Sequence, residues 1–504
     1  MVRVVKSDEM KAYDKDTIQK IGIPSLVLME RAALVTVDEI EKCRRIEEKV
    51  LVVAGNGNNG GDGLAIGRIL ALKGAEVTFL LAGSREKATQ ETSTQIRIIE
   101  NLGFSIQSKL ENEEYDMVID ALFGIGLSRN VEGTYLALIE ELNRMKDRGA
   151  YICSVDIPSG ICADTGKIMG CAVKADLTVS YAYAKRGHLL YPGKTYTGIL
   201  KVRDIGIPEQ LNVSCPATAF TYEKQEINQL LPKRRADGNK GTFGKVILFA
   251  GSCDMCGACL ICAESIMRAG AGMVKIVSPV CNREVIQRAL PEAMLLSYEG
   301  QADEAELMKS LQWADVLVAG PGIGTREESL KILRTCLESS KIPAVLDADA
   351  LNLLSENAGL QKLILEQKER QIVLTPHPGE LTRLLQMDME QYRNNREEMI
   401  KMLVERYGCI VAAKDAVTIV AAAGKEQIYI NTSGNDGMAT AGSGDALAGI
   451  IGGLIAQRME GFEAAALGVF LHGLAGEAAA ERNSKYGVMA TDIVKELPLV
   501  MNQL

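Results

Sequence analysis

Four cysteines stand at every third position of "GSCDMCGACLIC", a spacing that raises the question of a metal site. They are Cys253, Cys256, Cys259 and Cys262. Repeated CxxC units are typical of zinc sites and iron–sulfur clusters. Helical residues three apart, however, are rotated by about 60° per step, so four such thiols cannot converge on one ion. We therefore predict free thiols that act as small buried side chains, and no metal cluster.

The stretch "NDGMATAGSGDALAGIIGGLIAQ" carries the strongest chemical signal in the chain. Apolar residues at helical spacing follow Asp445, so Gly442 and Gly444 would open a buried helix whose amides point at an anion. Asp445 would then lie beside that anion and could accept a proton from a hydroxyl that attacks a phosphoryl group. The alternative is that Ser443 and Asp445 only cap the helix.

Three other turns could complete a phosphoryl site in this half of the chain. "AGPGIG" (319–324) is a glycine turn, "LTPHPGE" places His377 between two prolines, and "AAKDAVTIV" (412–420) predicts two short strands around a tight turn. Each alone is an ordinary loop or hairpin, and a lone loop histidine is more often incidental than catalytic. Their occurrence together favours one site.

A second glycine-rich segment, "VVAGNGNNGGDGLAIG", lies near the start of the chain. Gly55, Gly57 and Gly60 match the GxGxxG pattern of dinucleotide-binding turns. The next strand-like run, "FLLAGS", ends without the acid that would bind a ribose, and the loop holds extra Asn and Asp residues that a plain turn does not need. The alternative is a polar connector.

Two acids end other strand-like runs of the same half, Asp120 and Asp156. The carboxyl ends of parallel strands share one edge of a sheet, so these acids favour a polar ligand site there, although Asp156 could merely cap its proline turn. Asn59, Asp120 and Ser159 would offer hard oxygen donors to a cation such as K⁺ or Mg²⁺.

The elements that must position these residues alternate between strand and helix. Strand-like runs of the first half lie at 49–55, 76–83, 115–124 and 150–160, with helical patterns at 63–74, 88–102 and 134–148. Those of the second half lie at 244–252, 272–279, 314–324, 342–352, 370–380 and 408–422. This alternation predicts α/β domains with parallel, helix-covered sheets and a boundary near 210–225.

Bulk composition narrows the class of protein. The chain has 504 residues and a net charge of -9, which favours two or three domains and disfavours a nucleic-acid surface. The N-terminus lacks the apolar segment of a signal peptide, and no apolar stretch is long enough to span a bilayer. With 12 cysteines and no export signal, we expect free thiols in a reducing cytoplasm.

The first half resembles the NAD(P)H-hydrate epimerase domain in "GNGNNGGDG", "DALFGIGLSRNVEG", "VDIPSG" and "AKRGHLLYPGKTYTGILKVRDIGIP". The resemblance covers about 1–215 and implies a Rossmann-like three-layer sandwich, with K⁺ held by Asn59, Asp120 and Ser159. It implies that the hydrate is bound by Asn58, Asn59, Gly60, Gly61, Asp62, Gly124, Ile125, Gly126, Leu127, Ser128, Arg129, Asn130 and Asp156. We expect Asp156 to be the acid–base group, and Lys185 to be either a second polar group or a solvated loop lysine.

The second half resembles the ADP- or ATP-dependent NAD(P)H-hydrate dehydratase over about 225–504, through these motifs and "KGTFGKVILFAGS". The resemblance implies a ribokinase-like fold with Ala258, Gly322, His377 and Asp445 at the hydrate. It implies that the adenine nucleotide, with Mg²⁺, is bound by Lys414, Asp415, Ala416, Val417, Thr418 and Gly444. Asp436 stands where the family has proline in "GNPGMAT", which questions the rigidity of that loop.

Together the two resemblances imply an enzyme that repairs hydrated NADH and NADPH. The first domain would interconvert the R and S hydrates (NADHX and NADPHX). The second, with Asp445 as base, would dehydrate the S form, with ADP as the expected donor giving AMP and phosphate. Relatives commonly assemble, so we expect a homo-oligomer without nucleic-acid or membrane partners. The alternative is a ribokinase-like small-molecule kinase with a non-catalytic N-terminal binding or assembly module.

Overall fold

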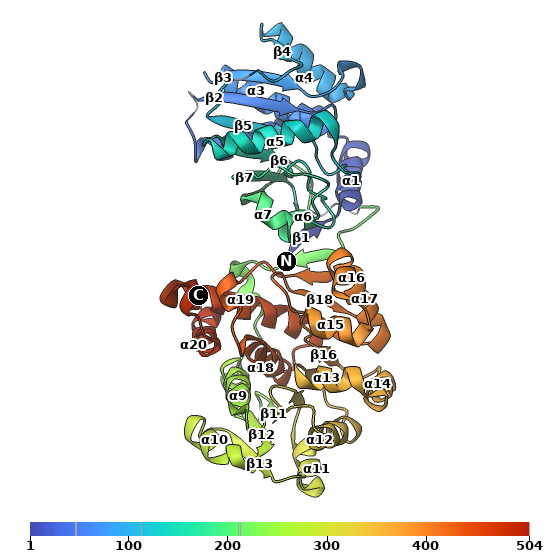
Figure 1. Cartoon of the computed structure of the whole chain (residues 1–504), viewed down its shortest axis with the longest axis vertical. Helices are drawn as coiled ribbons and strands as arrows, with labels where there is room; N and C mark the ends of the chain where they lie inside the picture. The colour runs from blue at the N-terminus through green and yellow to red at the C-terminus, as the bar shows by residue number, and fades with distance from the viewer. Residues whose placement is uncertain (46–47, 112, 210, 212, 503–504) are drawn as a thin grey trace. The chain divides into compact units, whose positions relative to one another are not determined.

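A computed structural model describes residues 1–45, 48–111, 113–209, 211 and 213–502. The chain divides into two compact units, Val2–Ala219 and Phe220–Leu504 with Met1 (Figure 1). Residues 210 and 212, which fall within the predicted boundary, lie outside the described residues. Each unit is a strand-and-helix domain with its own apolar core, so each is described by itself.

The N-terminal unit is built on a parallel sheet of seven strands in the order β4-β3-β2-β5-β6-β7-β9. The strands are β2 (Lys49–Ala54), β3 (Glu76–Leu81), β4 (Ile106–Gln107), β5 (Met117–Ala121), β6 (Tyr151–Val155), β7 (Leu177–Tyr181) and β9 (Ile199–Arg203). β2, β5 and β6 are almost wholly buried, as expected for strands covered on both faces.

Helices cover both faces of this sheet, which gives the predicted three layers. Buried side chains of α2 (Ser25–Glu41), α3 (Asn58–Leu72) and α4 (Gln90–Asn101) form one core, and those of α5 (Gly133–Asp147) form another. The remaining elements are β1 (Val2–Val5), paired with β8 (Ala184–Lys185), and the helices α1 (Ser7–Asp16), α6 (Arg186–Leu189) and α7 (Gly193–Thr197). The Rossmann-like prediction is confirmed.

The strand order reverses between β2 and β5, and this point positions the first site. The chain runs outward from β2 through β3 to β4, then returns to β5 on the other side of β2. Ligands of open α/β sheets bind outside the strand carboxyl ends at such a reversal. The loop after β2 and the loop after β5 therefore flank one crevice.

The C-terminal unit has a larger mixed sheet in the order β13-β12-β11-β14-β15-β16-β17-β18-β19-β10. It is parallel from β13 to β17 and antiparallel from β17 to β19. The strands are β10 (Ala219–Thr221), β11 (Lys245–Phe249), β12 (Met273–Pro279), β13 (Met294–Tyr298), β14 (Val316–Ala319), β15 (Ala344–Leu346), β16 (Ile372–Leu374), β17 (Ile410–Ala413), β18 (Ile419–Ala422) and β19 (Ile428–Ile430).

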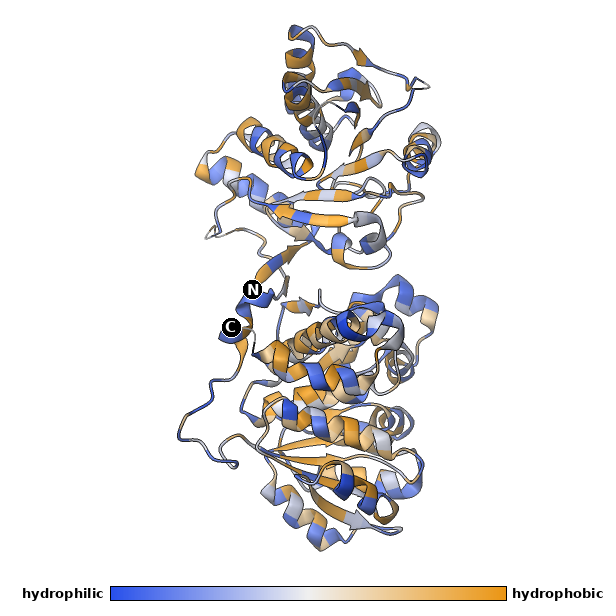
Figure 2. Cartoon of the chain, turned by 90° about the vertical axis from the view of Figure 1, so that its left-hand side faces the viewer, coloured by the Kyte–Doolittle hydropathy of each residue, from blue (hydrophilic) through white to orange (hydrophobic). Residues whose placement is uncertain are grey.

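Helices again cover this sheet, and the strands of both units are mainly hydrophobic in Figure 2. The helices are α8 (Ile227–Leu230), α9 (Cys256–Arg268), α10 (Arg283–Ala289), α11 (Glu304–Trp313), α12 (Glu327–Glu338), α13 (Asp349–Glu356), α14 (Ala358–Leu365), α15 (Pro378–Leu385), α16 (Met389–Asn394), α17 (Arg396–Tyr407), α18 (Ser443–Ala456), α19 (Gly461–Gly487) and α20 (Ala490–Met501). The ribokinase-like prediction is confirmed. No helix among the described residues is long and apolar enough to cross a membrane.

The cysteine run lies where α9 packs against α18. Cys259 and Cys262 are fully buried, and a Cβ on Gly449 would lie 2.4 Å from the Cys262 carbonyl oxygen. These two thiols therefore fill space at a close helix contact, as small side chains can. The prediction of free thiols is wrong for Cys253, which is bonded to Cys281 across a Cα–Cα distance of 5.9 Å. The partner is 28 residues away, so the local spacing could not indicate it.

Candidate functional site

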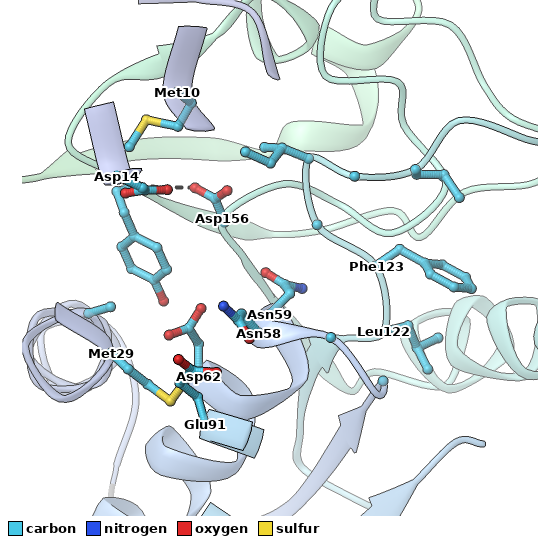
Figure 3. A pocket seen from close by; sticks show the side chains of 18 of the residues that line it. Met10, Asp14, Met29, Asn58, Asn59, Asp62, Glu91, Leu122, Phe123 and Asp156 are labelled. Atoms are coloured by element: carbon cyan, nitrogen blue, oxygen red, sulfur yellow. Dashed lines mark hydrogen bonds between the residues drawn. The ribbon is translucent and has the colours of Figure 1, made fainter. Parts of the chain in front are cut away.

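A cavity of about 550 Å³ lies at the strand reversal of the N-terminal unit (Figure 3). Its lining brings together most residues predicted to bind the hydrate: Asn58, Asn59, Asp62, Gly124, Ile125, Gly126, Leu127, Ser128, Arg129 and Asp156. They come from the start of α3 and from the loops after β5 and β6. Three loops of distant sequence thus meet at one edge of the sheet.

Three of the predicted hydrate-binding residues, Gly60, Gly61 and Asn130, are not part of this lining. A Cβ on Gly60 would lie 1.9 Å from the Gly55 carbonyl oxygen, and one on Gly61 would lie 2.6 Å from the Met29 methyl group. The two glycines therefore allow close packing of the turn, and larger side chains would displace the loop.

Asp156 has a constrained backbone at the edge of the cavity. Its φ of 63° lies in the left-handed region, which a residue other than glycine adopts at some cost. A ring nitrogen of His188 contacts its carbonyl oxygen at 2.8 Å. Burial and the Lys185 ammonium lower the pKa of His188 to about 4, so this imidazole is neutral and donates the hydrogen bond.

Lys185 is buried and forms an ion pair with Asp156. Its Nζ lies 2.5 Å from Oδ1 of Asp156, and it also donates to the Ser180 hydroxyl and the Tyr181 carbonyl. The Tyr181 amide donates to the same Asp156 oxygen at 3.2 Å. Lys185 has no exposed surface, so the expectation of a solvated loop lysine is wrong, and the paired ammonium belongs to the site.

The oxygen donors predicted to hold K⁺ cluster behind the cavity. The Ser159 hydroxyl donates to Asp120 Oδ1 at 2.5 Å, and the Ser159 amide donates to Oδ2 at 2.9 Å. Asn59 lies against the loop after β5, where a Cβ on Gly124 would meet its side-chain oxygen at 3.1 Å. The Asn59 amide nitrogen is buried without a hydrogen-bond partner among the described residues. Neutral and anionic oxygens in a tight buried cluster suit a hard monovalent cation.

Several cavity residues were not identified from the sequence, above all Asp14 of α1 and Tyr181 of β7. Asp14 lies in "SDEMKAYDKD", where alternating charges are typical of a solvated helix face. Nothing in that segment indicates that one carboxyl faces a cavity whose other lining residues extend as far along the chain as Ile205.

In the C-terminal unit, Asp445 occupies the first turn of α18. Gly442 precedes the helix with φ 87°, a left-handed conformation that suits glycine. Burial and the neighbouring Asp347 raise the pKa of Asp445 to about 7, although Lys414 opposes the shift. A carboxyl beside helix N-terminal amides that titrates near neutrality can accept a proton at physiological pH.

A buried ion pair lies next to Asp445. Lys414 Nζ is 2.6 Å from Asp347 Oδ1, which also accepts a hydrogen bond from the Thr375 hydroxyl at 2.7 Å. The other oxygen, Asp347 Oδ2, is buried without a partner among the described residues and would lie 3.7 Å from a Cβ on Gly444. Asp347 follows β15 in "VLDADALN"; that segment was identified only as a strand end, so its role was missed.

Among the other predicted hydrate contacts, Ala258 and Gly322 lie against each other, and His377 lies near Lys414 and Asp347. A Cβ on Gly322 would lie 3.0 Å from the Ala258 Cβ, so these two residues are adjacent. His377 caps α15, accepting a hydrogen bond from the Gly379 amide at 3.0 Å. Burial and nearby Lys414 lower the pKa of His377, which favours its neutral form. The structure thus brings His377 toward the Lys414 side of the site.

The predicted nucleotide-binding turn connects β17 to β18, with Lys414, Asp415, Ala416, Val417 and Thr418 between or beside the two strands. The Tyr392 hydroxyl donates to Asp415 at 3.1 Å, and Arg396 donates to the Val417 carbonyl. α16 and α17 therefore hold the turn from outside. Gly444, assigned to the nucleotide as well, lies next to Lys414 across the site.

Comparison with families of known proteins matches both units of the chain. A family described as "YjeF-related protein N-terminus" matches residues 25–187, and one described as "NAD(P)H-hydrate dehydratase" matches residues 246–499. Among curated relatives, the bifunctional NAD(P)H-hydrate repair enzyme of Moorella thermoacetica is 35% identical over 99% of this chain and 97% of its own length. The Escherichia coli enzyme of the same description is 33% identical over 98% and 93%.

Solved structures resemble the C-terminal unit. A hypothetical protein from Streptococcus mutans is 27% identical over 56% of this chain and 99% of its own, with a TM-score of 0.50. The ADP/ATP-dependent NAD(P)H-hydrate dehydratase from Bacillus subtilis, co-crystallised with ATP/Mg²⁺, is 26% identical over 56% of this chain and 96% of its own, with a TM-score of 0.48.

Proposed function

The chain belongs to the family of bifunctional NAD(P)H-hydrate repair enzymes, and from that premise we propose how its residues perform the two reactions. The N-terminal unit is an epimerase and the C-terminal unit is a nucleotide-dependent dehydratase. Water added across the C5–C6 double bond of a dihydronicotinamide leaves a hydroxyl on C6, next to the ring nitrogen. The two C6 epimers are the R and S hydrates.

Asp445 is the general base of the dehydratase. It takes the proton of the hydrate hydroxyl as that oxygen attacks the terminal phosphoryl group of the nucleotide, whose P–O bond to the leaving nucleotide breaks. The amides around Gly442 and Gly444, with the Lys414 ammonium, stabilise the phosphoryl charge. The C6–O bond then breaks with its electron pair on phosphate, and loss of a proton from C5 restores the double bond. The observation that carries this assignment is Asp445 at the glycine-opened N-terminus of α18 beside Lys414.

Mg²⁺ and an adenine nucleotide fit this site. Bound Mg²⁺ neutralises phosphate charge. The free Oδ2 of Asp347, a buried carboxylate oxygen without a partner among the described residues, would hold it. The turn 414–418 would hold the nucleotide through its backbone and Lys414. ADP is the proposed donor, by analogy with the family that the fused chain resembles; AMP and phosphate are then the products.

Asp156 is an acid–base residue of the epimerase. Two observations support this role: Asp156 lines the cavity, and Lys185 holds its oxygen Oδ1 in place. K⁺ fits the cluster of Asn59, Asp120 and Ser159 behind the same cavity, where it would counter the buried Asp120 charge. Burial raises the pKa of Asp120, an effect that a cation there would reverse.

A homo-oligomer in the cytoplasm completes the proposal. The oligomer is supported by exposed apolar side chains of α2: Leu26, Val27 and Leu34 are 39%, 46% and 46% exposed. Light scattering of the purified chain measures its mass, and a monomer would contradict the oligomer.

One assay tests the proposed reactions. Separated R and S hydrates are mixed with enzyme and either ADP or ATP, and the absorbance of the reduced cofactor is followed. The wild-type chain should consume both hydrates, Asp156→Ala only the S form, and Asp445→Asn neither, while still binding nucleotide. Accumulation of a stable phosphorylated hydrate would indicate a small-molecule kinase instead, and equal turnover with ATP would reject the preference for ADP.

A further inference from the structure

One carboxyl of the epimerase cavity has no partner among the described residues and no assigned task. Asp14 lies near the end of α1, lines the cavity, and makes no hydrogen bond or ion pair with any described residue. Figure 3 draws it beside Asp156 at one end of the pocket. A π-helical turn, Thr17–Ile21, follows directly after α1, and its Ile18 lines the same cavity. Such turns in natural helices often mark functional sites.

The surroundings of Asp14 set its protonation. Burial, with the adjacent Asp156 carboxylate, raises the pKa of Asp14 to about 6, while the Lys185 ammonium opposes this shift. The titratable groups that share the cavity with it are Asp62, Glu91, Arg129, Tyr135, Asp156, Tyr181 and Lys185. Burial raises the pKa values of Asp62 and Tyr181 well above their usual ranges. Asp14 is thus a carboxyl of the cavity that has no partner among the described residues, lies beside Asp156 and titrates near neutral pH.

The reaction needs two proton-transfer groups. The hydrate carbon carries both a hydroxyl and a ring nitrogen, and such a centre inverts when its C–N bond opens to an aldehyde and closes again on the other face. Opening removes the hydroxyl proton while the nitrogen gains one. Asp156 can fill only one of these tasks at a time, and three donors already hold its Oδ1: Lys185, Ser180 and the Tyr181 amide.

We propose that Asp14 is the second catalytic residue of the epimerisation, the acid that works with Asp156 as base. Asp156 takes the hydroxyl proton and the C6–O bond becomes a carbonyl. The C6–N bond breaks with its electron pair on nitrogen, which receives the Asp14 proton. After rotation of the aldehyde, nitrogen attacks the other face of C6, its proton returns to Asp14, and the new hydroxyl takes the proton back from Asp156. The enzyme ends in its starting state, so the step balances.

The inference rests on the proposed epimerase function, and one substitution tests it. Asp14→Asn keeps the shape of the side chain but cannot donate and take back the proton. We expect kcat for R-to-S conversion to fall by about 100-fold or more, with KM within about twofold, as for loss of a general acid. The matched control is Asp8→Asn on the exposed side of the same helix, where the side chain is 86% exposed; it should convert R at the wild-type rate.

Dehydration of pure S hydrate by the same Asp14→Asn chain should be unchanged, because its residues lie in the C-terminal unit, and thermal unfolding of the N-terminal unit should match wild type if the variant folds. The pH profile gives a second measurement. The active pair carries one proton, so wild-type kcat/KM for epimerisation should fall as pH rises through about 6, and this fall should vanish in Asp14→Asn. An Asp14→Asn rate within about twofold of wild type, or a raised KM with unchanged kcat, would overturn the role of Asp14. A wild-type chain that leaves R hydrate unchanged would instead overturn the proposed epimerase function.

Discussion

The two proposed sites lie on different sheets, yet each places a lysine-paired aspartate beside an aspartate that has no ionic partner in the described part of the chain. In the epimerase cavity Lys185 holds Asp156 and Asp14 is unpaired; in the dehydratase site Lys414 holds Asp347 and Asp445 is unpaired. In both, burial and the paired neighbour raise the pKa of the unpaired acid, to about 6 for Asp14 and about 7 for Asp445.

The sites differ in what surrounds that unpaired acid. Asp445 lies among the N-terminal amides of a glycine-opened helix, which suit a phosphoryl group, whereas Asp14 lies on the last turns of α1 and faces other carboxyls. The shared arrangement tunes a carboxyl for proton transfer near neutrality. The neighbouring hydrogen-bond donors decide whether that proton transfer accompanies phosphoryl transfer, as at Asp445, or opening and closing of the hydrate ring, as at Asp14.

Breaking either lysine pair should have the largest effect on stability. Lys185→Met and Lys414→Met each leave a buried carboxylate without its counter-charge, and removing one partner of a buried pair costs about 3–5 kcal/mol. Chemical denaturation would measure this loss. The control is Arg203→Met, which breaks the pair with Glu39 away from both cavities. Because Arg203 is 35% exposed, this change should lower the free energy of unfolding by less. If both lysine variants lose less than about 1 kcal/mol of unfolding free energy, the two ion pairs do not stabilise their sites in the same way.

Replacing the unpaired acid by a neutral side chain should raise stability, whereas breaking a lysine pair lowers it. The pKa of Asp445 is raised in the folded chain from 3.8 to about 7, so folding favours its protonated form and stability is lost as pH rises through about 7. Asp445→Asn should therefore stabilise the C-terminal unit at pH 8 by about 1–3 kcal/mol, a value discounted for partial solvent access. Thermal unfolding at pH 8 and pH 4 tests this, because the gain should vanish at pH 4.

Asp347→Asn should move the pH dependence of dehydration. Asp347 raises the pKa of Asp445, so its removal should lower that pKa and shift the acid limb of kcat/KM to lower pH, while the loss of the proposed Mg²⁺ ligand should lower kcat/KM at every pH. Profiles of S-hydrate turnover for wild type and variant give the comparison. A limb that stays in place would show that Asp347 does not raise the pKa of Asp445, and the two sites would then differ in origin.

The smallest effect is expected at Asp436, outside both pairs. Asp436 begins a short helical turn, where proline is well accepted, and the preceding Asn435 is already extended at φ -147°. Asp436→Pro loses only an exposed ion pair with Lys485, so stability should change by less than about 1 kcal/mol in either direction. A larger loss in thermal unfolding would show that the departure from the family's proline matters to this loop.

Site residues could be predicted from the sequence when they lie within a recognisable motif, and not when they lie outside one. Asp156 and Asp445 could be selected because each ends a strand or opens a helix in a glycine-rich segment, where backbone geometry limits the alternatives. Asp14 and Asp347 could not, because one lies in an amphipathic helix and the other follows a strand whose neighbours are known only from the sheet order.

The fold was easier to predict than the packing, for the same reason. Long apolar runs such as Lys49–Ala54 and Met273–Pro279 predict buried parallel strands directly. The partly buried strand Met294–Tyr298 and the two-residue strand Ile106–Gln107 were not predicted, because they are too short or too weakly patterned to indicate a strand alone. The Cys253–Cys281 bond depends on contacts between distant segments, which spacing does not encode.

The division of the chain at residue 219 has a consequence for how much of each activity a cell holds. Every residue proposed for epimerisation lies in Val2–Ala219, and every residue proposed for dehydration lies in Phe220–Leu504. No residue proposed for one reaction lies in the unit that is proposed to catalyse the other. The covalent link therefore acts on dosage: one translation product fixes the two catalysts at equal number, so neither epimer can accumulate through unequal expression of the two steps.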